Sequence, residues 1–346
     1  MKVAIVGVGS VGETCAHALV VSDVVSELVL LNRTVETAAA IERDLRQARA
    51  WRGNLVTESG PIDNLEPVLG CDLVVLTLGP RLQGKQKRDD VAGKSADLLT
   101  KSGVASELRR LQPRLPPVLV VTNPVEPIVT WLWKQTGIAP SKLFGLGTTV
   151  DAARLSMHIG NRLGVSARSA WTTLVGEHGE GIIIAGHGSL SGLVPDERLK
   201  QVEERSLFHT KKDAAVIRNL TERVARGQAE RLLENLEHIL GHKASAPQRA
   251  QALDCLANDV APPATRFAIA AAVTEVARAM HADEKRVMTV SSTAPAEWKV
   301  SAVALALPFQ IGRSGLGRCL LADAPNGLSA IASRIEQVVQ LLPATR

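Results

Sequence analysis

Two short segments in the middle of the chain contain side chains that together could transfer a proton and bind an anion. They are Asp151-Ala-Ala-Arg154 and Gly176-Glu177-His178-Gly179. His178 suits proton transfer because the pKa of a histidine lies near neutral pH. A buried carboxylate such as Asp151 would fix the tautomer of the ring and stabilise the imidazolium. Arg154, one helical turn after Asp151, is expected on the same side, where it can bind a carboxylate with two hydrogen bonds.

A glycine-rich segment near the N-terminus has the spacing of a dinucleotide-binding turn. It reads Gly7-Val-Gly9-Ser10-Val11-Gly12, directly after an expected strand and directly before an expected helix. The first glycine permits a tight turn, the second lets the backbone approach a pyrophosphate, and the third lets the helix pack close to the strand. The helix N-terminus adds free N–H groups and partial positive charge. The alternative is a glycine-rich turn without a ligand.

The residues that end the second expected strand indicate which dinucleotide is preferred. NAD-binding proteins place Asp or Glu there to accept hydrogen bonds from the ribose hydroxyls, whereas this chain has Asn32, Arg33 and Thr34. An acidic side chain about 4 Å from a 2′-phosphate would be repelled by roughly 4 kcal/mol at an effective dielectric constant near 20. Arg33 can bind that phosphate, while Asn32 and Thr34 donate neutral hydrogen bonds. We therefore expect NADP(H), with NAD(H) bound through other contacts as the alternative.

The first 150 residues alternate apolar runs with helical stretches, which is typical of βαβ units and a parallel sheet. This pattern predicts an α/β, Rossmann-type doubly wound parallel sheet. The expected strands are Lys2–Gly7, Glu27–Leu31, Asn54–Glu58, Asp72–Leu78, Val118–Thr122 and Lys142–Leu146. The expected helices are Val11–Val20, Val35–Ala50, Ser95–Arg110 and Pro127–Thr136.

The pattern changes after the sixth expected strand, which predicts a dinucleotide-binding domain at 1–146 and an α+β substrate-binding domain at 147–346. A polar, proline-bearing stretch, Gly241–Pro263, is expected to be a long loop or an insertion with short helices. The other expected elements of this half are helices at Asp151–Leu163, Ala264–Met280 and Leu328–Leu342, an amphipathic stretch at Asp196–Leu240, and a β-rich portion at Arg286–Leu307.

The composition of the chain indicates which classes of partner it is not expected to bind. The net charge of +5 comes from dispersed basic residues, and the chain has no Tyr and few Phe, so we expect no nucleic acid. The apolar runs are far shorter than the ~20 residues of a membrane helix, so we expect no membrane. The chain runs from Met1 straight into a strand-like segment, which leaves no room for a signal peptide. With four scattered cysteines that lack metal spacing, these features predict a cytoplasmic protein without a bound metal.

The order and spacing of these landmarks resemble those of the lactate/malate dehydrogenase family. Thr122-Asn123-Pro124-Val125 lies between the glycine turn and Asp151, with Asp151 28 residues after Asn123 and His178 a further 27 residues on. The segment Gly79–Val91 resembles the mobile lid of the family, and Leu307–Leu316 resembles its closing strand. The likeness covers nearly the whole chain, except for a break between about Leu232 and Pro263.

The resemblance implies a hydride transfer between a nicotinamide cofactor and a 2-oxo or 2-hydroxy acid. His178 and Asp151 would then handle the proton, and Arg154 would bind the substrate carboxylate. The resemblance further implies that Arg88 closes over the substrate and polarises its carbonyl, and that Asn123 orients the substrate oxygen and the nicotinamide. It places Thr265 near the substrate side chain. The remaining cofactor contacts would come from Thr77, Leu78, Gly79 and Ile269.

The sequence allows two assignments of the lid position that distinguishes malate from lactate dehydrogenases. Counting back from Arg88 without gaps assigns it to Leu82, and aligning Pro80-Arg81 with the malate-type pair assigns it to Arg81. The lid is strongly basic in either case, which favours a small substrate with an anionic tail.

Two other functions remain alternatives. One is a reductase of an imine or an unusual oxo acid in a specialised pathway, and the other is a nucleotide-binding redox sensor that no longer turns over. A sensor has no need of His178, Asp151, Arg154 and Arg88 together, which argues against it. A related glycosidase branch needs a metal bound through Cys and His, and no such spacing occurs. The family resemblance also implies a homodimer or homotetramer.

Overall fold

The computed structural model describes residues 1–80, 88–178, 181–186, 193–195 and 266–344. Its strands are β1 (Lys2–Val6), β2 (Glu27–Asn32), β3 (Val56–Pro61), β4 (Leu73–Leu76), β5 (Val118–Val120), β6 (Leu143–Gly145), β7 (Thr173–Glu177), β8 (Gly181–Gly186), β9 (Arg286–Thr293), β10 (Ala304–Gly312) and β11 (Gly315–Cys319). Its helices are α1 (Ser10–Val21), α2 (Val35–Arg49), α3 (Arg88–Lys101), α4 (Val104–Arg110), α5 (Val125–Thr136), α6 (Thr149–Leu163), α11 (Arg266–His281) and α12 (Leu328–Gln340). Short 3-10 helices lie at Ala50–Arg52, Glu66–Val68, Ala167–Ser169 and Ala296–Trp298.

The described strands form one sheet in the order β3-β2-β1-β4-β5-β6-β9-β10-β7-β8, with β11 paired to β10. The first six strands are parallel, and β9 then joins β6 in the antiparallel sense. The order reverses at β1, where the chain leaves β3 on one side and crosses to β4 on the other. This confirms the predicted Rossmann-type sheet, and such reversal points are where these sheets bind ligands.

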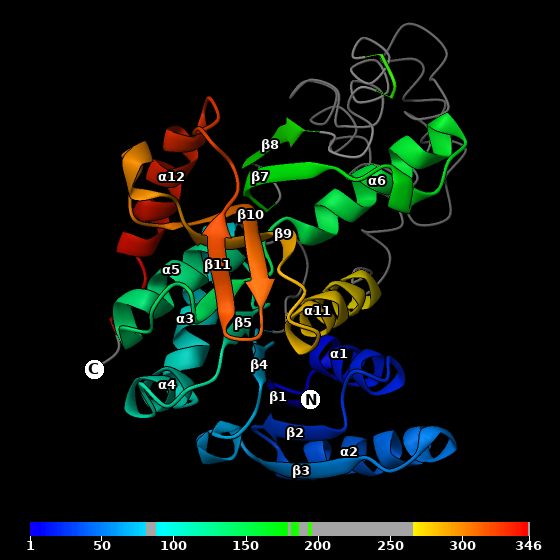
Figure 1. Cartoon of the computed structure of the whole chain (residues 1–346). Coiled ribbons are helices and arrows are strands. Elements are labelled where there is room, and N and C mark those ends of the chain that lie inside the picture. Colours follow the sequence, from blue (N-terminus) through cyan, green and yellow to red (C-terminus); the bar gives the residue numbers. More distant parts are fainter. Residues whose placement is uncertain (81–87, 179–180, 187–192, 196–265, 345–346) are drawn as a thin grey trace, which may run out of the picture. The chain divides into compact units, whose positions relative to one another are not determined.

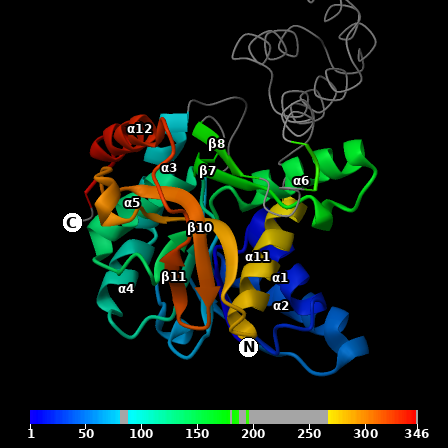
Figure 2. The ribbon, with the colours of Figure 1, turned by 45° about the horizontal axis from the view of Figure 1, so that its top comes forward.

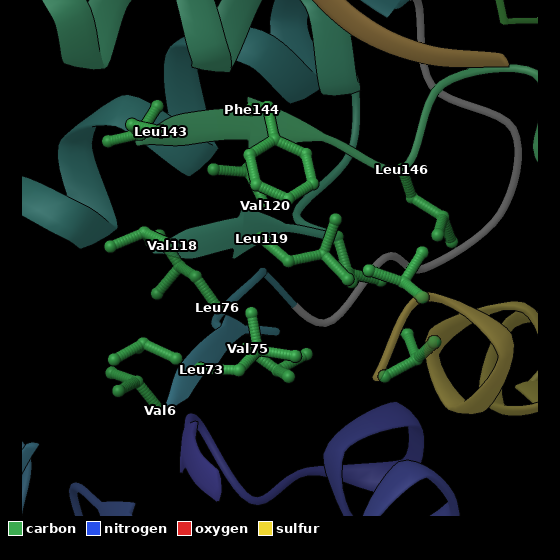
Figure 3. Close-up of a cluster of buried hydrophobic side chains, with 14 of the residues drawn as sticks. Val6, Leu73, Val75, Leu76, Val118, Leu119, Val120, Leu143, Phe144 and Leu146 are labelled. Atoms are coloured by element: carbon green, nitrogen blue, oxygen red, sulfur yellow. The ribbon is translucent and has the colours of Figure 1, made fainter. Parts of the chain in front are cut away.

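Strands β1, β2, β4 and β5 are almost wholly buried and consist mainly of Val, Leu and Ile, as expected for parallel strands covered on both faces, whereas the edge strand β3 is largely exposed. Side chains of β1, β4, β5 and β6 lie side by side in the centre of the sheet (Figure 3), and Ile5, Leu76 and Phe144 are at most 1% exposed. Helices α1, α2 and α11 lie on one side of the sheet, and α3, α4, α5 and α12 on the other (Figures 1 and 2).

The chain divides into two compact units. The first contains residues 1–151, 173–185 and 266–346, so the C-terminal strands and helices belong to the same unit as the glycine turn. The second contains residues 152–172 and 186–265; in its described part, Thr172 Oγ1 donates to Ala152 O at 3.0 Å and lies 3.2 Å from Ser156 Oγ. The predicted functional boundary at residue 146 stays a prediction.

The single helix predicted over Ser95–Arg110 is wrong, because two helices occupy this stretch. Gly103 adopts a left-handed conformation, with φ of +78°, and separates α3 from α4. Helix α3 also begins earlier, at Arg88, and Asp89 and Asp90 in its first turn favour that start through the helix dipole. Arg88–Val91, expected to end the lid, is therefore helical.

Candidate active site

The glycine turn between β1 and α1 has no room for larger residues at two of its three glycines. Gly7 has a φ of +98°, and a Cβ there would lie 2.7 Å from the backbone of Leu78. A Cβ on Gly12 would collide with the carbonyl oxygen of Gly7, so helix and strand approach as closely as their backbones allow. Thr77 Oγ1 donates to Gly7 O at 2.6 Å and joins the turn to the end of β4.

The second glycine of the turn differs from its neighbours because it borders open space. A Cβ on Gly9 would meet nothing within 4 Å, and Gly9 and Ser10 are exposed at the N-terminus of α1. The free N–H groups of a helix N-terminus, next to a backbone without a side chain, fit the pyrophosphate of a dinucleotide. Val11 and Thr77 are half-buried, Leu78 is buried and Gly79 is exposed, so the turn and the end of β4 could both contact such a cofactor.

The residues expected to determine the preference for NADP(H) or NAD(H) lie in the turn between β2 and α2. Asn32 ends β2, and its Nδ2 donates to Thr34 O at 3.2 Å, which closes the turn. Arg33 and Thr34 are exposed, and no acidic side chain occupies the end of the strand. The turn therefore presents one cation and neutral polar groups to solvent.

Arg266 is a basic residue near the glycine turn that the sequence did not identify. It begins α11, which packs against α1 (Figure 1), and its Nη1 donates to Ser10 Oγ at 3.2 Å. The guanidinium lies 4.9 Å from the ring centroid of Phe267. Ile269, one turn further on, is half-buried. No local pattern could have revealed this pair, because 256 residues separate Arg266 from Ser10.

His178 and Asp151 form the predicted pair. His178 Nδ1 lies 2.5 Å from Asp151 Oδ2, and their side chains are 28% and 10% exposed. Gly176 positions the histidine segment because a Cβ at its φ of +109° would collide with Gly181 O, so only glycine allows β7 and β8 to approach. Thr148 Oγ1 donates to Leu174 O at 2.5 Å and joins the start of α6 to β7.

The environment of His178 favours the imidazolium. Burial lowers the pKa of His178, but the hydrogen bond and charge of Asp151 raise it more, and the charge of Glu126 raises it further. Arg88 opposes this by lowering the pKa, and the net effect is a pKa above the ordinary histidine value. A protonated His178 can donate to a substrate oxygen through Nε2 while Nδ1–H stays bonded to Asp151.

Arg88 lies in a cluster of four charged side chains from four elements. Arg88 Nη2 lies 3.2 Å from Glu177 Oε1 and 3.6 Å from Glu126 Oε2. Glu177 also accepts from Arg334 of α12, and Glu126 Oε1 accepts from Ser291 Oγ at 2.8 Å. The two glutamates were not identified as site residues from the sequence, although Glu177 adjoins His178 and Glu126 follows the Asn-Pro-Val segment.

Asn123 lies at the end of the loop that follows β5. It is exposed, and a cis peptide bond joins it to Pro124. Its carbonyl oxygen accepts from Ser95 Oγ of α3 at 2.7 Å, and Thr122 Oγ1 donates to Leu78 O at 2.8 Å. These contacts fix the loop to the end of β4 and to α3 and leave the Asn123 amide at the surface.

In the first unit, the glycine turn, Thr77, Asn123 and Asp151 thus follow the carboxyl ends of β1, β4, β5 and β6, where His178 contacts Asp151 and Arg88 pairs with Glu126. Arg154 is exposed on α6, three residues after Asp151, and belongs to the second unit. Arg81, Leu82 and Thr265 lie outside the described residues.

Residues 1–145 match the family model described as "lactate/malate dehydrogenase, NAD binding domain". Over 320 residues the chain is 27% identical to an L-lactate dehydrogenase of Clostridium perfringens, which covers 92% of this chain and 89% of the relative. It is 28% identical over 316 residues to an L-lactate dehydrogenase of Thermus aquaticus, covering 91% and 90%. The structure of the malate dehydrogenase from Aeropyrum pernix matches with a TM-score of 0.72 at 20% identity, covering 99% and 98%.

Over 92% of its length the chain is similar to a member of the lactate/malate dehydrogenase family, and residues 1–145 match the model of that family's N-terminal domain. Its N-terminal part is similar to the NAD-binding domain of these enzymes, and the similarities support a lactate/malate dehydrogenase-like oxidoreductase. The cysteines that the structure describes are free, with Cys15 and Cys71 buried. Within the described ranges no helix is long and apolar enough to cross a membrane, and no group of three His, Cys, Asp or Glu side chains could hold a metal ion.

Proposed function

We propose that the protein is an NADP(H)-dependent dehydrogenase that interconverts a small 2-oxo acid and its 2-hydroxy acid, with His178 as the acid–base group. The observation that carries the proposal is the 2.5 Å contact between His178 and Asp151 in the first unit, which also holds the glycine turn. The named relatives, two L-lactate dehydrogenases and a malate dehydrogenase, act on 2-hydroxy acids, which supports the same substrate class here.

The nicotinamide cofactor, when bound, supplies or accepts the hydride. Gly7, Gly9 and Gly12 would hold its pyrophosphate against the N-terminus of α1, with Arg266 as a nearby cation. Thr77, Leu78 and Gly79 would contact it from the end of β4, and Ile269 from α11. Arg33 would bind the 2′-phosphate of NADP(H) with charge-assisted hydrogen bonds, and Asn32 and Thr34 would add neutral ones.

In the reducing direction, His178 donates a proton to the oxygen of the substrate carbonyl as hydride reaches the carbon. Asp151 keeps Nδ1 protonated, so that the proton leaves from Nε2. Arg88 polarises the carbonyl, Asn123 orients the oxygen, and Arg154 binds the carboxylate. In the oxidising direction, neutral His178 takes the hydroxyl proton instead.

The basic lid residues suggest a substrate with an anionic tail, with Arg81 or Leu82 and Thr265 nearest to it. The family resemblance also favours a homodimer or homotetramer in the cytoplasm.

The test follows the absorbance of NADPH and NADH in parallel, with 2-oxo acids that carry apolar, carboxylate, phosphonate and sulfonate tails. We expect oxidation of NADPH in preference to NADH, and faster turnover with anionic tails. Turnover only after addition of ammonia would indicate an imine substrate instead. Binding of either cofactor without turnover on any member would indicate a redox sensor.

A matched pair of variants tests the cofactor assignment. Arg33→Ala should weaken NADPH binding about 10- to 100-fold through loss of a charge-assisted contact, and should affect NADH little. Arg43→Ala, a basic residue of α2 outside the turn, is the control. If Arg33→Ala weakened the binding of NADPH and NADH equally, this turn would not bind the 2′-phosphate.

A further inference from the structure

Arg88 is held by two buried carboxylates from different parts of the chain. The side chain of Glu126, on α5, has 0% exposure, and that of Glu177, at the end of β7, has 4%. Arg334, on α12, is 41% exposed and pairs with the second oxygen of Glu177, while Ser291 donates to Glu126. Two arginines and two glutamates balance in charge, which permits burial of the two carboxylates.

The ion pairs leave part of the Arg88 guanidinium free to donate. Its Nε and Nη2 atoms are buried and have no hydrogen-bond partner among the described residues, and the same is true of Glu126 Oε2. Nη2 lies 3.2 Å from the Glu177 carboxylate and 3.6 Å from that of Glu126. Attraction between charges therefore holds the guanidinium, although Nη2 forms no hydrogen bond within the described part of the chain. Buried donors without acceptors are uncommon, and a catalytic role is one of the reasons for which proteins retain them.

We propose that Glu126 and Glu177 are positioning residues, which hold the Arg88 guanidinium beside His178 so that the exposed part of the Arg88 side chain meets the substrate oxygen. The inference rests on the proposed function, because it assumes that Arg88 acts on the substrate. It adds that α5, β7 and α12 determine where this arginine lies. Arg334 acts indirectly, because it pairs with Glu177 and compensates the charge of that carboxylate.

The same cluster sets the electrostatic balance at His178. In the first unit, the charged groups that act on the imidazole are Asp151 and Glu126, which favour its protonation, and Arg88, which opposes it. Glu177, next in sequence, and Arg334 complete the neighbouring charges. Glu126→Gln removes a negative charge that favours protonation of His178, and it also leaves the positive charge of Arg88 less neutralised. Both changes lower the pKa of His178.

The first measurement needs no substrate. The His178 imidazole is titrated by NMR in the wild type and in Glu126→Gln, with His178→Asn identifying its signal. We expect the pKa of His178 to fall by ~0.5 unit or more in Glu126→Gln. Glu275→Gln, which removes a carboxylate paired with Arg278 and Arg286, is the matched control and should leave the titration unchanged.

The second measurement separates positioning from folding. With NADPH and the best 2-oxo acid, we expect Glu126→Gln and Glu177→Gln to lower kcat about 10- to 100-fold, since a misplacement of about 1 Å costs up to 10²-fold. In an Arg88→Gln background the same substitutions should have little further effect, because the residue that they position is gone. Equal fold losses in both backgrounds, or an unchanged titration of His178, would overturn the proposal.

If Glu126→Gln does not fold, Glu126→Asp keeps the charge and shortens its reach. We then expect a His178 titration near that of the wild type with a reduced kcat, and a wild-type kcat would count against positioning. If Glu126→Gln shifts the titration and no 2-oxo acid is reduced by the wild type, the proposed substrate class fails while the link from Glu126 to His178 stands.

Discussion

The glycine turn and the charged cluster around Arg88 represent two ways of building a site. The turn is a backbone structure made within six consecutive residues; its conformation depends on the absence of side chains at Gly7 and Gly12, and Gly9 leaves its outer surface open. The cluster is made of long side chains from α3, α5, β7 and α12, and Glu126 lies 51 residues before Glu177. A local backbone site can be recognised from sequence spacing, whereas a cluster of distant charges needs the fold.

The largest effect should come from the His178–Asp151 pair, which adjoins the charged cluster through Glu177. Asp151→Asn should lower turnover by about 10²–10⁴-fold, because an amide neither stabilises the imidazolium nor fixes the tautomer with Nδ1–H. Cofactor binding, measured by fluorescence of bound NADPH, should stay close to that of the wild type. Weaker NADPH binding together with wild-type turnover would show that Asp151 acts in cofactor binding and not in proton transfer.

Two glycine variants sharpen the contrast within the turn. Gly12→Ala places a methyl group against Gly7 O and should lower the free energy of unfolding by about 1–3 kcal/mol. Gly9→Ala places it in open space, so stability should change by less than about 0.5 kcal/mol while dinucleotide binding weakens. Chemical denaturation and cofactor titration of both variants check this, and unchanged binding in Gly9→Ala would show that the cofactor does not approach the turn.

A smaller, graded effect is expected from pH. Because the pKa of His178 is raised, the protonated form persists above the ordinary value of about 6.5, and kcat/KM for 2-oxo acid reduction should fall only as the pH rises through that higher pKa. The stabilising contact with Asp151 is lost over the same range. Oxidation of the 2-hydroxy acid should show the opposite trend. A reduction rate that rises through neutral pH would contradict this protonation state.

The sequence predicted the six parallel strands of the first 150 residues and the residues of the His178–Asp151 pair, because strand periodicity and spacing along the chain are local signals. It did not predict that α3 begins at Arg88, since the basic stretch before it resembles a loop and the two acidic residues of the first turn, Asp89 and Asp90, are a weak signal. Arg266 and Glu126 were also missed. Their contacts, to Ser10 and to Ser291, span 256 and 165 residues, and charge alone does not distinguish such residues from a solvated surface.

The most direct test of the account compares single-turnover oxidation of NADPH by the wild type and His178→Asn, with the best 2-oxo acid. The account predicts that hydride transfer slows by about 10²–10⁴-fold in the variant, because Asn cannot donate the proton, while the affinity for NADPH is retained. Hydride transfer at the wild-type rate in His178→Asn would contradict the central claim and remove His178 from the mechanism.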